Sequence, residues 1–430
     1  MQQHLRLFRN DPERFAANLL QFTNPERFRE RLIDVLTGAR LHVRIDNTRA
    51  NRPTLNVLQP VLSPTSMTGG PNTIINIAFW VARQGIEVRL VTTRNDDALD
   101  SQWFWRHLAA VTGASEPPST LSLASASNPT TPLPIGPRDM FLATHWTTAQ
   151  QVKDVVPIME VKRFFYLIQD FEPGFYAWSS NYALALETYG LDHIGLFNER
   201  LLLDYLVMQQ AGLYAEPSFA AKALVFEPAI DRKLFHPPAA PRVGGKSNRR
   251  LLFYTRPTNH RNMLGMGLNA LRAAVKDPVF KQADWDFLAI GSRGSMPDLP
   301  LGEGKTLRVA PWQDFAEYAA QLSASDILLC PMLSPHTSYP VLEMAACGGM
   351  TVTNCFGTKT AAKLESISAN IVATAPTTED ICRGLIVAAA RVNRGVDIYA
   401  PLNLPASWRE SLSGTATEMS RMFRAITGAT

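Results

Sequence analysis

Two arginines in one short loop are the first candidates for binding chemistry. The stretch 253–262 reads FYTRPTNHRN, with Arg256 at the end of an expected strand and Arg261 near the start of an expected helix. Two guanidinium groups beside a helix N-terminus would suit a diphosphate, because they add forked donors and fixed charge to the helix dipole. Two solvated surface arginines fit the same positions, so the pattern alone leaves both interpretations open.

A second loop runs from small polar residues directly into a helix. The stretch 334–349 reads SPHTSYPVLEMAACGG, in which Pro340 suits the first helical turn and Ser338 or Tyr339 suits the N-cap. Glu343, expected in the first turn, could merely complement the helix dipole. A carboxylate there could also accept hydrogen bonds from the two hydroxyls of a ribose, while the cap amides face a phosphate. Taken alone, this pattern favours capping.

A third loop offers acid–base chemistry. The stretch 166–178 reads YLIQDFEPGFYAW and places Asp170 and Glu172 among aromatic residues after an expected strand. Carboxylates flanked by apolar rings can have a raised proton affinity and act as general bases, and the rings could stack on sugar faces. An acidic loop with Phe171 and Phe175 packed inward would explain the same residues.

A fourth loop contains a pair of glycines. The stretch 65–73, TSMTGGPNT, brings Gly69 and Gly70 to the start of an expected helix. It matches neither the dinucleotide fingerprint G-x-G-x-x-G nor a P-loop, which disfavours NAD enzymes and ATPases. Glycines still permit close approach to the backbone, so we expect this loop to contact a substrate, either the acceptor of a transferred group or a phosphate.

Regular elements must position these loops, and the chain alternates strands with helices twice. From Thr54, a buried β-run, a Gly-containing loop, an amphipathic helix and a second β-run predict a βαβ unit with a parallel sheet. The segment 235–250 is rich in Pro, Gly and basic residues and marks a linker, after which the alternation restarts. The expected fold is therefore α/β, with two Rossmann-like doubly wound domains facing across a cleft.

The chain divides into four expected segments. Residues 51–240 form the first Rossmann-like domain, residues 241–405 the second, and residues 406–430 a final helix. Residues 1–50 form a helical extension, in which DPERF and NPERF each place a cap residue before a proline at the first helical position. These two amphipathic helices could pack on the main body, on a partner protein or on a membrane surface.

The bulk composition disfavours several classes of protein. With 46% hydrophobic and 19% charged residues, the chain has the composition of a soluble globular protein. A net charge of +4 on 430 residues is weak evidence for a polyanion, so no nucleic-acid partner is expected. The four cysteines form no C-x-x-C pair and the eight histidines show no ligand spacing, so no metal is expected. The N-terminus does not read as a secretory signal and the apolar runs are short, which favours a cytoplasmic location.

Together these segments resemble the retaining-type GT-B glycosyltransferases, and among them the rhamnosyltransferase-like enzymes of bacterial surface-glycan assembly. The segment 225–237, VFEPAIDRKLFHP, looks like the interdomain signature of that superfamily, with Asp231, Phe235 and Pro237 as its marked residues. The stretch IQDFEPGFY is similar to one in the narrower rhamnosyltransferase-like group. The ordered series of motifs shifts the interpretation of the stretch 334–349 from capping to ligand capture.

The resemblance implies a reaction and roles for the candidate residues. A nucleotide sugar, dTDP-rhamnose, would donate L-rhamnose to a hydroxyl of a surface glycan or lipid-linked glycan, without a metal or other cofactor. Asp170 is the first candidate for the base that deprotonates the acceptor, and Glu172 is the second. The enzyme would act in the cytoplasm, where the N-terminal helices could bring it to the inner face of the membrane. The residues implied in donor binding are Arg256, Arg261, His336, Ser338, Tyr339 and Glu343.

Two departures from the family pattern affect the chemistry. Arg261 stands where the family has a lysine in the phosphate segment, and it can do the same electrostatic work with a different geometry. The usual first glutamate, eight positions before Glu343, is replaced by Pro335, with His336 beside it. The retaining or inverting outcome is therefore open, as are a mannosyl- or glucosyltransferase and a non-catalytic glycan-binding subunit.

Overall fold

The computed structural model describes residues 40–64, 67, 69–94, 100–238, 248–257, 259–292, 296–394 and 400–429. The helices expected from DPERF and NPERF lie outside these ranges. The end of the N-terminal extension forms strand β1 (Val43–Ile45) and the 3-10 turn η1 (Asn47–Arg49). The prediction of a helical extension up to residue 50 is therefore wrong for the strand residues 43–45. The physical reason is that β1 pairs with β5 (Leu133–Ile135) and packs its two apolar side chains against the core.

The first domain is built on a seven-stranded sheet in which all neighbouring strands are parallel, in the order β4-β3-β2-β6-β7-β8-β9. One apolar cluster covers each face of this sheet, with Val57 in one and Leu58 in the other, as the alternation of side chains along a strand requires. The strands are β2 (Leu55–Gln59), β3 (Val88–Thr92), β4 (Leu121–Ser125), β6 (Met140–Ala143), β7 (Phe164–Ile168), β8 (His193–Asn198) and β9 (Leu224–Phe226).

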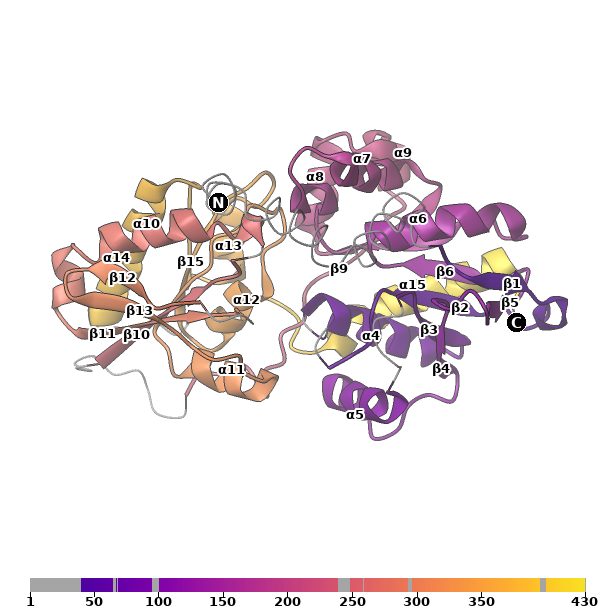
Figure 1. Ribbon diagram of the computed structural model, residues 1–430, viewed down its shortest axis with the longest axis horizontal. Coiled ribbons are helices and arrows are strands. Elements are labelled where there is room, and N and C mark those ends of the chain that lie inside the picture. Colours follow the sequence, from indigo (N-terminus) through magenta and orange to yellow (C-terminus); the bar gives the residue numbers. More distant parts are fainter. Residues whose placement is uncertain are drawn as a thin grey trace, which may run out of the picture.

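Helices connect most of these strands and cover the sheet, whereas β5 lies between β4 and β6 in the chain (Figure 1). Parallel strands need such connections, because each crossover has to return the chain to the end of the sheet at which the strands begin. The α-helices of this domain are α4 (Gly69–Ala82), α5 (Ser101–Thr112), α6 (Trp146–Val155), α7 (Ser180–Glu187), α8 (Arg200–Met208) and α9 (Pro217–Ala220). The short 3-10 turn η3 (Glu172–Phe175) follows β7.

The second domain has a seven-stranded sheet in the order β12-β13-β11-β10-β14-β15-β16, parallel except for the edge strand β12. Its strands are β10 (Asn248–Tyr254), β11 (Asp284–Ile290), β12 (Leu299–Gly302), β13 (Lys305–Val309), β14 (Ile327–Leu329), β15 (Met350–Asn354) and β16 (Ile371–Thr374). Its α-helices are α10 (Leu264–Ala274), α11 (Phe315–Ser323), α12 (Tyr339–Ala346), α13 (Ala361–Ile367) and α14 (Thr378–Arg394).

Both sheets are doubly wound, which confirms the predicted fold class. The winding direction reverses between β2 and β6 in the first sheet and between β10 and β14 in the second. Open α/β sheets bind ligands beyond the carboxyl ends of the strands at such a switch point. We therefore expect a ligand site at the loops that follow β10 and β14.

The C-terminal helix α15 (Trp408–Thr427) returns to the first domain. Its buried face joins the same apolar cluster as Val57, and Figure 1 shows this yellow helix beside the strands of the first sheet. The predicted final helix is confirmed, whereas its packing partner was not part of the prediction. The domain boundary predicted at residue 240 falls in residues 239–247, outside the described ranges.

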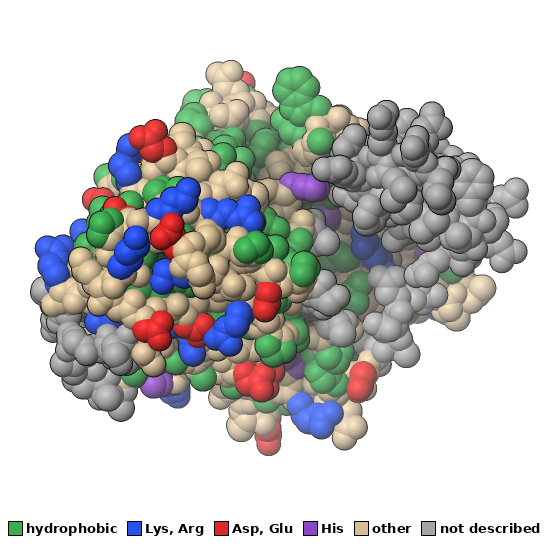
Figure 2. All heavy atoms as spheres, turned by 60° about the vertical axis from the view of Figure 1, so that its left-hand side comes forward, with side chains coloured by type: hydrophobic (Ala, Val, Ile, Leu, Met, Phe, Trp, Pro, Cys, Tyr) green, Lys and Arg blue, Asp and Glu red, His purple; other side chains and the backbone are tan. Residues whose placement is uncertain are grey.

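Charges of both signs are interspersed on the face of the second domain seen in Figure 2. Ion pairs on the surface of the second domain include that of Arg383 with Glu379 at 2.8 Å. This mixed surface differs from the concentrated basic stripe typical of nucleic-acid-binding proteins. Within the described residues, no helix is both long and apolar enough to cross a lipid bilayer.

Candidate active site between the two domains

The loops after β10 and β14 frame the candidate site, because these strands flank the switch point of the second sheet. The first of them carries Arg256 and Arg261, and the second carries residues 330–338. An ion pair from the first loop and hydrogen bonds from the second connect them to the residues that follow β7 and β8 in the first domain. The carboxyl ends of the two sheets thus face each other, as expected for two doubly wound domains around one site.

Helix α12 begins at Tyr339, which changes the interpretation of Glu343. Ser338 is the N-cap by position, but its side chain makes no capping hydrogen bond and its φ is 77°. Its Oγ instead lies 3.7 Å from the Sγ of Cys330. No acidic residue lies in the first turn, so the prediction that placed Glu343 there is wrong. The effect of the helix dipole falls off beyond the first turn, so the structure does not support a capping role for Glu343.

Glu343 is a buried carboxyl group with a tyrosine as its hydrogen-bond partner. Only 7% of its surface is exposed, and its Oε2 accepts a 2.8 Å hydrogen bond from the hydroxyl of Tyr318. Burial raises the pKa of Glu343 to about 7, against a lowering effect of that hydrogen bond. A carboxylate has about four acceptor positions, so Glu343 retains capacity for further donors such as ribose hydroxyls.

An ion pair across the domain boundary links two predicted site residues. Asp170, which follows β7, pairs through Oδ2 with Nη1 of Arg261 in the second domain. Its Oδ1 accepts a 2.5 Å hydrogen bond from the hydroxyl of Ser334 and a 2.8 Å bond from the amide of Phe171. The structure therefore brings the first candidate base into contact with a candidate phosphate-binding arginine.

The guanidinium of Arg261 is largely enclosed by protein. Its carbon Cζ lies 4.4 Å from the ring centroid of Phe175, a cation–π contact that occupies one face of that ring. Burial lowers the pKa of Arg261 to about 10, which leaves the group charged at neutral pH. A charged and partly desolvated guanidinium at a switch point suits an anionic ligand.

Arg256 and Glu343 both act on the phenol of Tyr254. Burial raises the pKa of Tyr254, the last residue of β10, while the charge of Arg256 and its hydrogen bond to the phenol act in the opposite direction. The carboxyl group of Glu343 acts on the same phenol. Both predicted arginines therefore lie at the carboxyl end of β10, although they contact different partners.

Tyr339 reaches from α12 into the first domain. Its hydroxyl accepts a 3.0 Å hydrogen bond from Nδ2 of Asn198 at the end of β8 and lies 3.3 Å from the hydroxyl of Thr73 on α4. A Cβ atom at Gly69 would stand only 3.2 Å from the Tyr339 ring. The predicted glycine loop thus allows close approach, and the group that approaches is a side chain of the second domain.

Glu172 has the contacts of a structural residue. Its Oε2 accepts a 2.6 Å hydrogen bond from the amide of Trp146, at the start of α6, and a 3.4 Å bond from the hydroxyl of Tyr166. Burial raises its pKa to about 8, so Glu172 is mainly neutral at pH 7. These partners all belong to the first domain, and a neutral carboxyl group that already accepts two hydrogen bonds is poorly suited to act as a base.

Glu199 is a buried carboxyl group that the sequence analysis missed. It follows β8, is 1% exposed and accepts hydrogen bonds from the amide and hydroxyl of Thr337 at 2.7 and 2.9 Å. The Nε2 atom of His336 lies 3.5 Å from its Oε1. Burial raises the pKa of Glu199 to about 8. The available signal was the apolar run HIGLF followed by Asn198, which reads as a strand that ends in polar residues.

Lys359 is a second residue that the sequence analysis missed. It is fully buried after β15, and its Nζ donates a 3.1 Å hydrogen bond to the carbonyl of Met332 in the loop after β14. Burial lowers its pKa to about 8. No sequence signal could have found it, because lysines are almost always exposed.

Three buried polar atoms near the domain boundary have no hydrogen-bond partner within the described part of the chain. They are Nε of Arg261, Oδ1 of Asn198, and Oε1 of Gln169, whose amide group lies beside Gly70. Buried polar groups in native proteins are nearly always satisfied. A ligand that carries both anionic oxygens and hydroxyl groups would satisfy this mixture of donor and acceptors.

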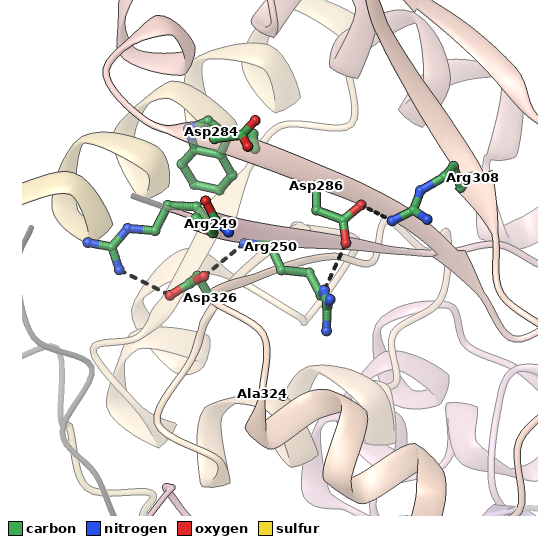
Figure 3. Close-up of a pocket in the computed structure, with 9 residues that line it drawn as sticks. Arg249, Arg250, Asp284, Asp286, Arg308, Ala324 and Asp326 are labelled. Atoms are coloured by element: carbon green, nitrogen blue, oxygen red, sulfur yellow. Dashed lines mark hydrogen bonds and ion pairs between the residues drawn. The ribbon is translucent and has the colours of Figure 1, made fainter. Parts of the chain in front are cut away.

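A polar pocket of about 480 Å³ lies at the opposite end of the second sheet, where β10 and β11 begin (Figure 3). Within it Arg249 pairs with Asp326 at 3.2 Å, and Asp286 is shared by Arg250 and Arg308. The charged groups in these pairs therefore compensate one another. Because doubly wound sheets bind ligands at the other end of the strands, we place the candidate site there.

Two protein-family models match the chain in order. The model of the WsaF N-terminal domain matches residues 54–200, and that of the WsaF C-terminal domain matches residues 249–386. The first match includes Asp170, and the second includes Arg261 and Glu343. Both sides of the candidate site therefore belong to the matched domains.

One curated relative is the O-antigen biosynthesis protein RfbC of Myxococcus xanthus. It is 36% identical to this chain over 222 residues. The aligned part makes up 50% of this chain but only 15% of RfbC, so the chain spans a small part of that relative.

Solved structures of glycosyltransferases share the architecture. Sucrose-phosphate synthase of Thermosynechococcus elongatus superposes with a TM-score of 0.58 at 12% identity, covering 88% of this chain and 100% of that chain. HepE of Anabaena in complex with UDP-glucose gives a TM-score of 0.55 at 11% identity, with 87% and 98% covered. At such identities the likeness shows the fold alone. Models of both WsaF domains thus match this chain in their N-to-C order, and the chain has the two-domain GT-B fold of glycosyltransferases.

Proposed function

We propose that this chain is a glycosyltransferase that moves a hexose from a nucleoside-diphosphate donor to a hydroxyl of a bacterial surface glycan. The observation that carries the proposal is the ion pair of Asp170 with Arg261, because it joins a carboxylate of one domain to a cation at the switch point of the other. The two WsaF domains and the O-antigen relative support surface-glycan assembly as the process.

For the donor we propose dTDP-L-rhamnose. HepE of Anabaena was solved in complexes with UDP and with UDP-glucose, which supports a nucleoside diphosphate as the ligand class for this fold. The choice of rhamnose rests on the resemblance of IQDFEPGFY to the rhamnosyltransferase-like group. Donors of mannose or glucose are the alternatives, because they would use the same diphosphate and ribose contacts.

The leaving diphosphate would be neutralised by protein groups in place of a metal ion. Arg256 and Arg261 supply fixed positive charge at the end of β10. Lys359 contacts the loop after β14 through the carbonyl of Met332. The amides at the start of α12 would complete the cradle. Preorganised groups of this kind stabilise developing negative charge without reorganisation during the reaction.

Asp170 would become the general base when the donor displaces it from Arg261. A diphosphate carries more negative charge than one carboxylate and competes with it for the same guanidinium. Asp170, once released, could accept the proton of the acceptor hydroxyl. With a β-linked donor and an α-linked product, one such base would support a direct displacement with inversion at the anomeric carbon.

For the acceptor we propose a growing glycan or its lipid-linked form. The region after β7 offers Trp178, which is 95% exposed, whereas Phe171 packs against the apolar core of the first domain. Exposed aromatic rings can stack on the apolar faces of sugars. We place the reaction in the cytoplasm at the inner face of the membrane, with residues 1–39 as the proposed contact to the membrane or to a partner protein.

A glycan-binding subunit without catalytic activity is the second candidate function. It is favoured by one feature, the presence of Pro335 where related enzymes have their first glutamate. Such a subunit would keep the aromatic side of the cleft and would not turn over a donor.

Release of nucleoside diphosphate tests the proposed function directly. The purified protein would be incubated with dTDP-rhamnose and with UDP-, GDP- and dTDP-linked glucose or mannose, with and without a surface-glycan acceptor. We expect acceptor-dependent release from a single donor, dTDP-rhamnose. Release from a glucose or mannose donor would support a glucosyl- or mannosyltransferase instead. Glycan binding without release from any donor would support a non-catalytic binding subunit.

Donor affinity should rise with pH because of Glu343. Burial raises the pKa of Glu343 to about 7, so its ionised form, which accepts hydrogen bonds from both ribose hydroxyls, becomes populated as the pH increases through that value. Calorimetry with an intact nucleotide sugar, whose phosphates do not titrate near neutral pH, should show tighter binding at about pH 8 than at about pH 6.

Glu343→Gln is the matched control for this pH dependence. The variant should bind the donor more weakly at pH 8 and should lose the rise in affinity. The thermal stability of the variant is an independent test of the raised pKa. A carboxyl group with a raised pKa destabilises the fold as the pH climbs towards that pKa, so the Gln variant should melt at or above the wild-type temperature at pH 8. A lower melting temperature with unchanged donor affinity would show a structural role for Glu343 and would contradict ribose binding.

A further inference from the structure

The loop 334–338, which we call the donor loop, is held to a large extent by the first domain. Ser334 donates to Asp170 at 2.5 Å, and Thr337 donates to Glu199 from both its amide and its hydroxyl. Hydrogen bonds within the loop add to these, such as the 3.0 Å bond from the amide of His336 to the hydroxyl of Ser334. Two carboxylates of the opposite domain thus hold the two halves of the loop.

Of these two carboxylates, Glu199 makes the more complete contact. Its Oε1 accepts the amide of Thr337 at 2.7 Å, and the hydroxyl of Thr337 lies 3.2 Å from Oε1 and 2.9 Å from Oε2. All four atoms belong to buried residues at the domain boundary. In such low-dielectric surroundings a hydrogen bond is electrostatically stronger than the same bond in water.

The same carboxyl group orients the imidazole of His336. The amide of Ser338 donates a 2.9 Å hydrogen bond to Nδ1, so Nδ1 carries no proton. Burial lowers the pKa of His336 to about 3, so the ring is neutral and its single proton is on Nε2. Nε2 lies 3.5 Å from Oε1 of Glu199, which places this proton towards the carboxyl group.

The backbone on both sides of the contact is strained. Glu199 has a φ of 84° and Ser338 has a φ of 77°, values that residues with a side chain rarely adopt. Such conformations persist where the surroundings over-determine them, and they cluster at ligand-binding sites. The Glu199 conformation thus carries an energetic cost that its contacts to the donor loop offset.

We infer that Glu199 is a positioning residue: from across the domain boundary it holds Thr337 and His336 in place, so that the donor loop is complete only when the two domains are closed. This inference rests on the proposed function in one respect, the identity of the ligand as a nucleoside-diphosphate donor. It goes beyond that function because it makes donor binding depend on a residue of the acceptor domain.

Glu199→Gly is the decisive variant, because glycine adopts a positive φ without strain. The variant removes the carboxyl group and relieves the backbone at the same time, so a loss of function would not come from backbone strain. Hydrogen exchange of peptides that cover residues 333–345 should be faster in the ligand-free variant. Affinity for dTDP and UDP, measured by calorimetry, should fall roughly tenfold to a hundredfold, the range for a buried donor that loses its hydrogen-bond partner.

Glu303→Gly is the matched control. Glu303 is also a glutamate at positive φ, with a φ of 53°, but it is exposed in the turn between β12 and β13. The control should leave both the exchange of residues 333–345 and the diphosphate affinity at wild-type values. Equal effects of the two variants would overturn the inference.

Two further variants separate positioning from charge and guard against misfolding. Thr337→Val removes the hydroxyl contacts from the opposite side and should reproduce part of the loss. Glu199→Gln can accept the Thr337 amide and donate to its hydroxyl, so it should recover most of the affinity. A Gln variant as weak as the Gly variant would show a requirement for charge and would overturn the positioning role.

The exchange and affinity measurements also distinguish this inference from the proposed function. Wild-type protein that binds neither diphosphate would contradict the proposed function, while the exchange comparison would still show whether Glu199 holds the loop. Wild-type protein that binds, together with Glu199→Gly protein of equal affinity, would contradict the inference alone.

Discussion

Asp170→Asn is expected to lower turnover by about 10²–10⁴-fold, the usual contribution of a general base. The substitution preserves the shape of the side chain and its hydrogen bond to Ser334, but it removes the group that would accept the proton of the acceptor hydroxyl. Steady-state turnover with the donor and acceptor identified in the release assay, together with calorimetry of diphosphate binding, measures the two effects separately.

The affinity measurement distinguishes a base from a simple link between the domains. Because Asp170 occupies Arg261 in the structure, the diphosphate has to displace it, and the Asn variant removes this competition. A base therefore predicts slow turnover with diphosphate affinity equal to or above that of the wild type. Weaker diphosphate binding with a proportionate loss of turnover would identify Asp170 as an interdomain link instead.

Glu172→Gln is the matched control for the Asp170 variant. Glu172 lies two positions further along the same loop, and its raised pKa keeps it mainly neutral at pH 7, where glutamine is a close substitute. We expect its turnover to stay within a few-fold of the wild type. Turnover of a well-folded Asp170→Asn variant in that same range would exclude the proposed base.

Arg261→Ala should weaken diphosphate binding by about 1.5–3 kcal/mol, the range for hydrogen bonds to charged groups. The variant removes the fixed charge at the switch point and leaves Asp170 without its ion-pair partner. Calorimetry with dTDP and UDP measures the loss. Arg261→Lys keeps the charge but loses the planar contact with Phe175, so its affinity should lie between those of the wild type and the Ala variant.

Arg308→Ala is the control for a general loss of positive charge. Arg308 belongs to the same domain and pairs with Asp286, but it lies in the pocket at the opposite end of the sheet (Figure 3). Diphosphate affinity should remain at the wild-type value in this variant. A loss as large as that of Arg261→Ala would show that the effect comes from net charge and would contradict a specific phosphate contact.

Much of the architecture could be predicted because it depends on residues that are close in sequence. The apolar runs that became β2, β7, β10 and β14 and the helical periodicity that became α4 and α10 are local patterns. Strand β8 escaped prediction although its run HIGLFN is apolar, and with it Asn198 and Glu199 were lost. Because this strand was not predicted, two residues of the candidate site were not predicted either.

The roles of several predicted residues depended on partners that the sequence does not specify. Glu343 was expected in the first turn of its helix, and the start of α12 at Tyr339 placed it further along. Glu172 was grouped with Asp170 because the two are close in sequence. In the structure one carboxyl group bonds to the start of α6, and the other pairs with the second domain. Sequence proximity could not separate them, because the burial of neighbouring side chains depends on the path of the backbone.

By itself, the sequence determined that this protein has two doubly wound domains and loops suited to a diphosphate and a sugar, because hydrophobic periodicity and motif spacing are properties of neighbouring residues. Only the tertiary structure decided which side chains meet. Ser334 contacts Asp170 across 164 positions of the chain, and Thr337 contacts Glu199 across 138. Such contacts follow from the packing of one domain against the other, and no local pattern in the sequence records them.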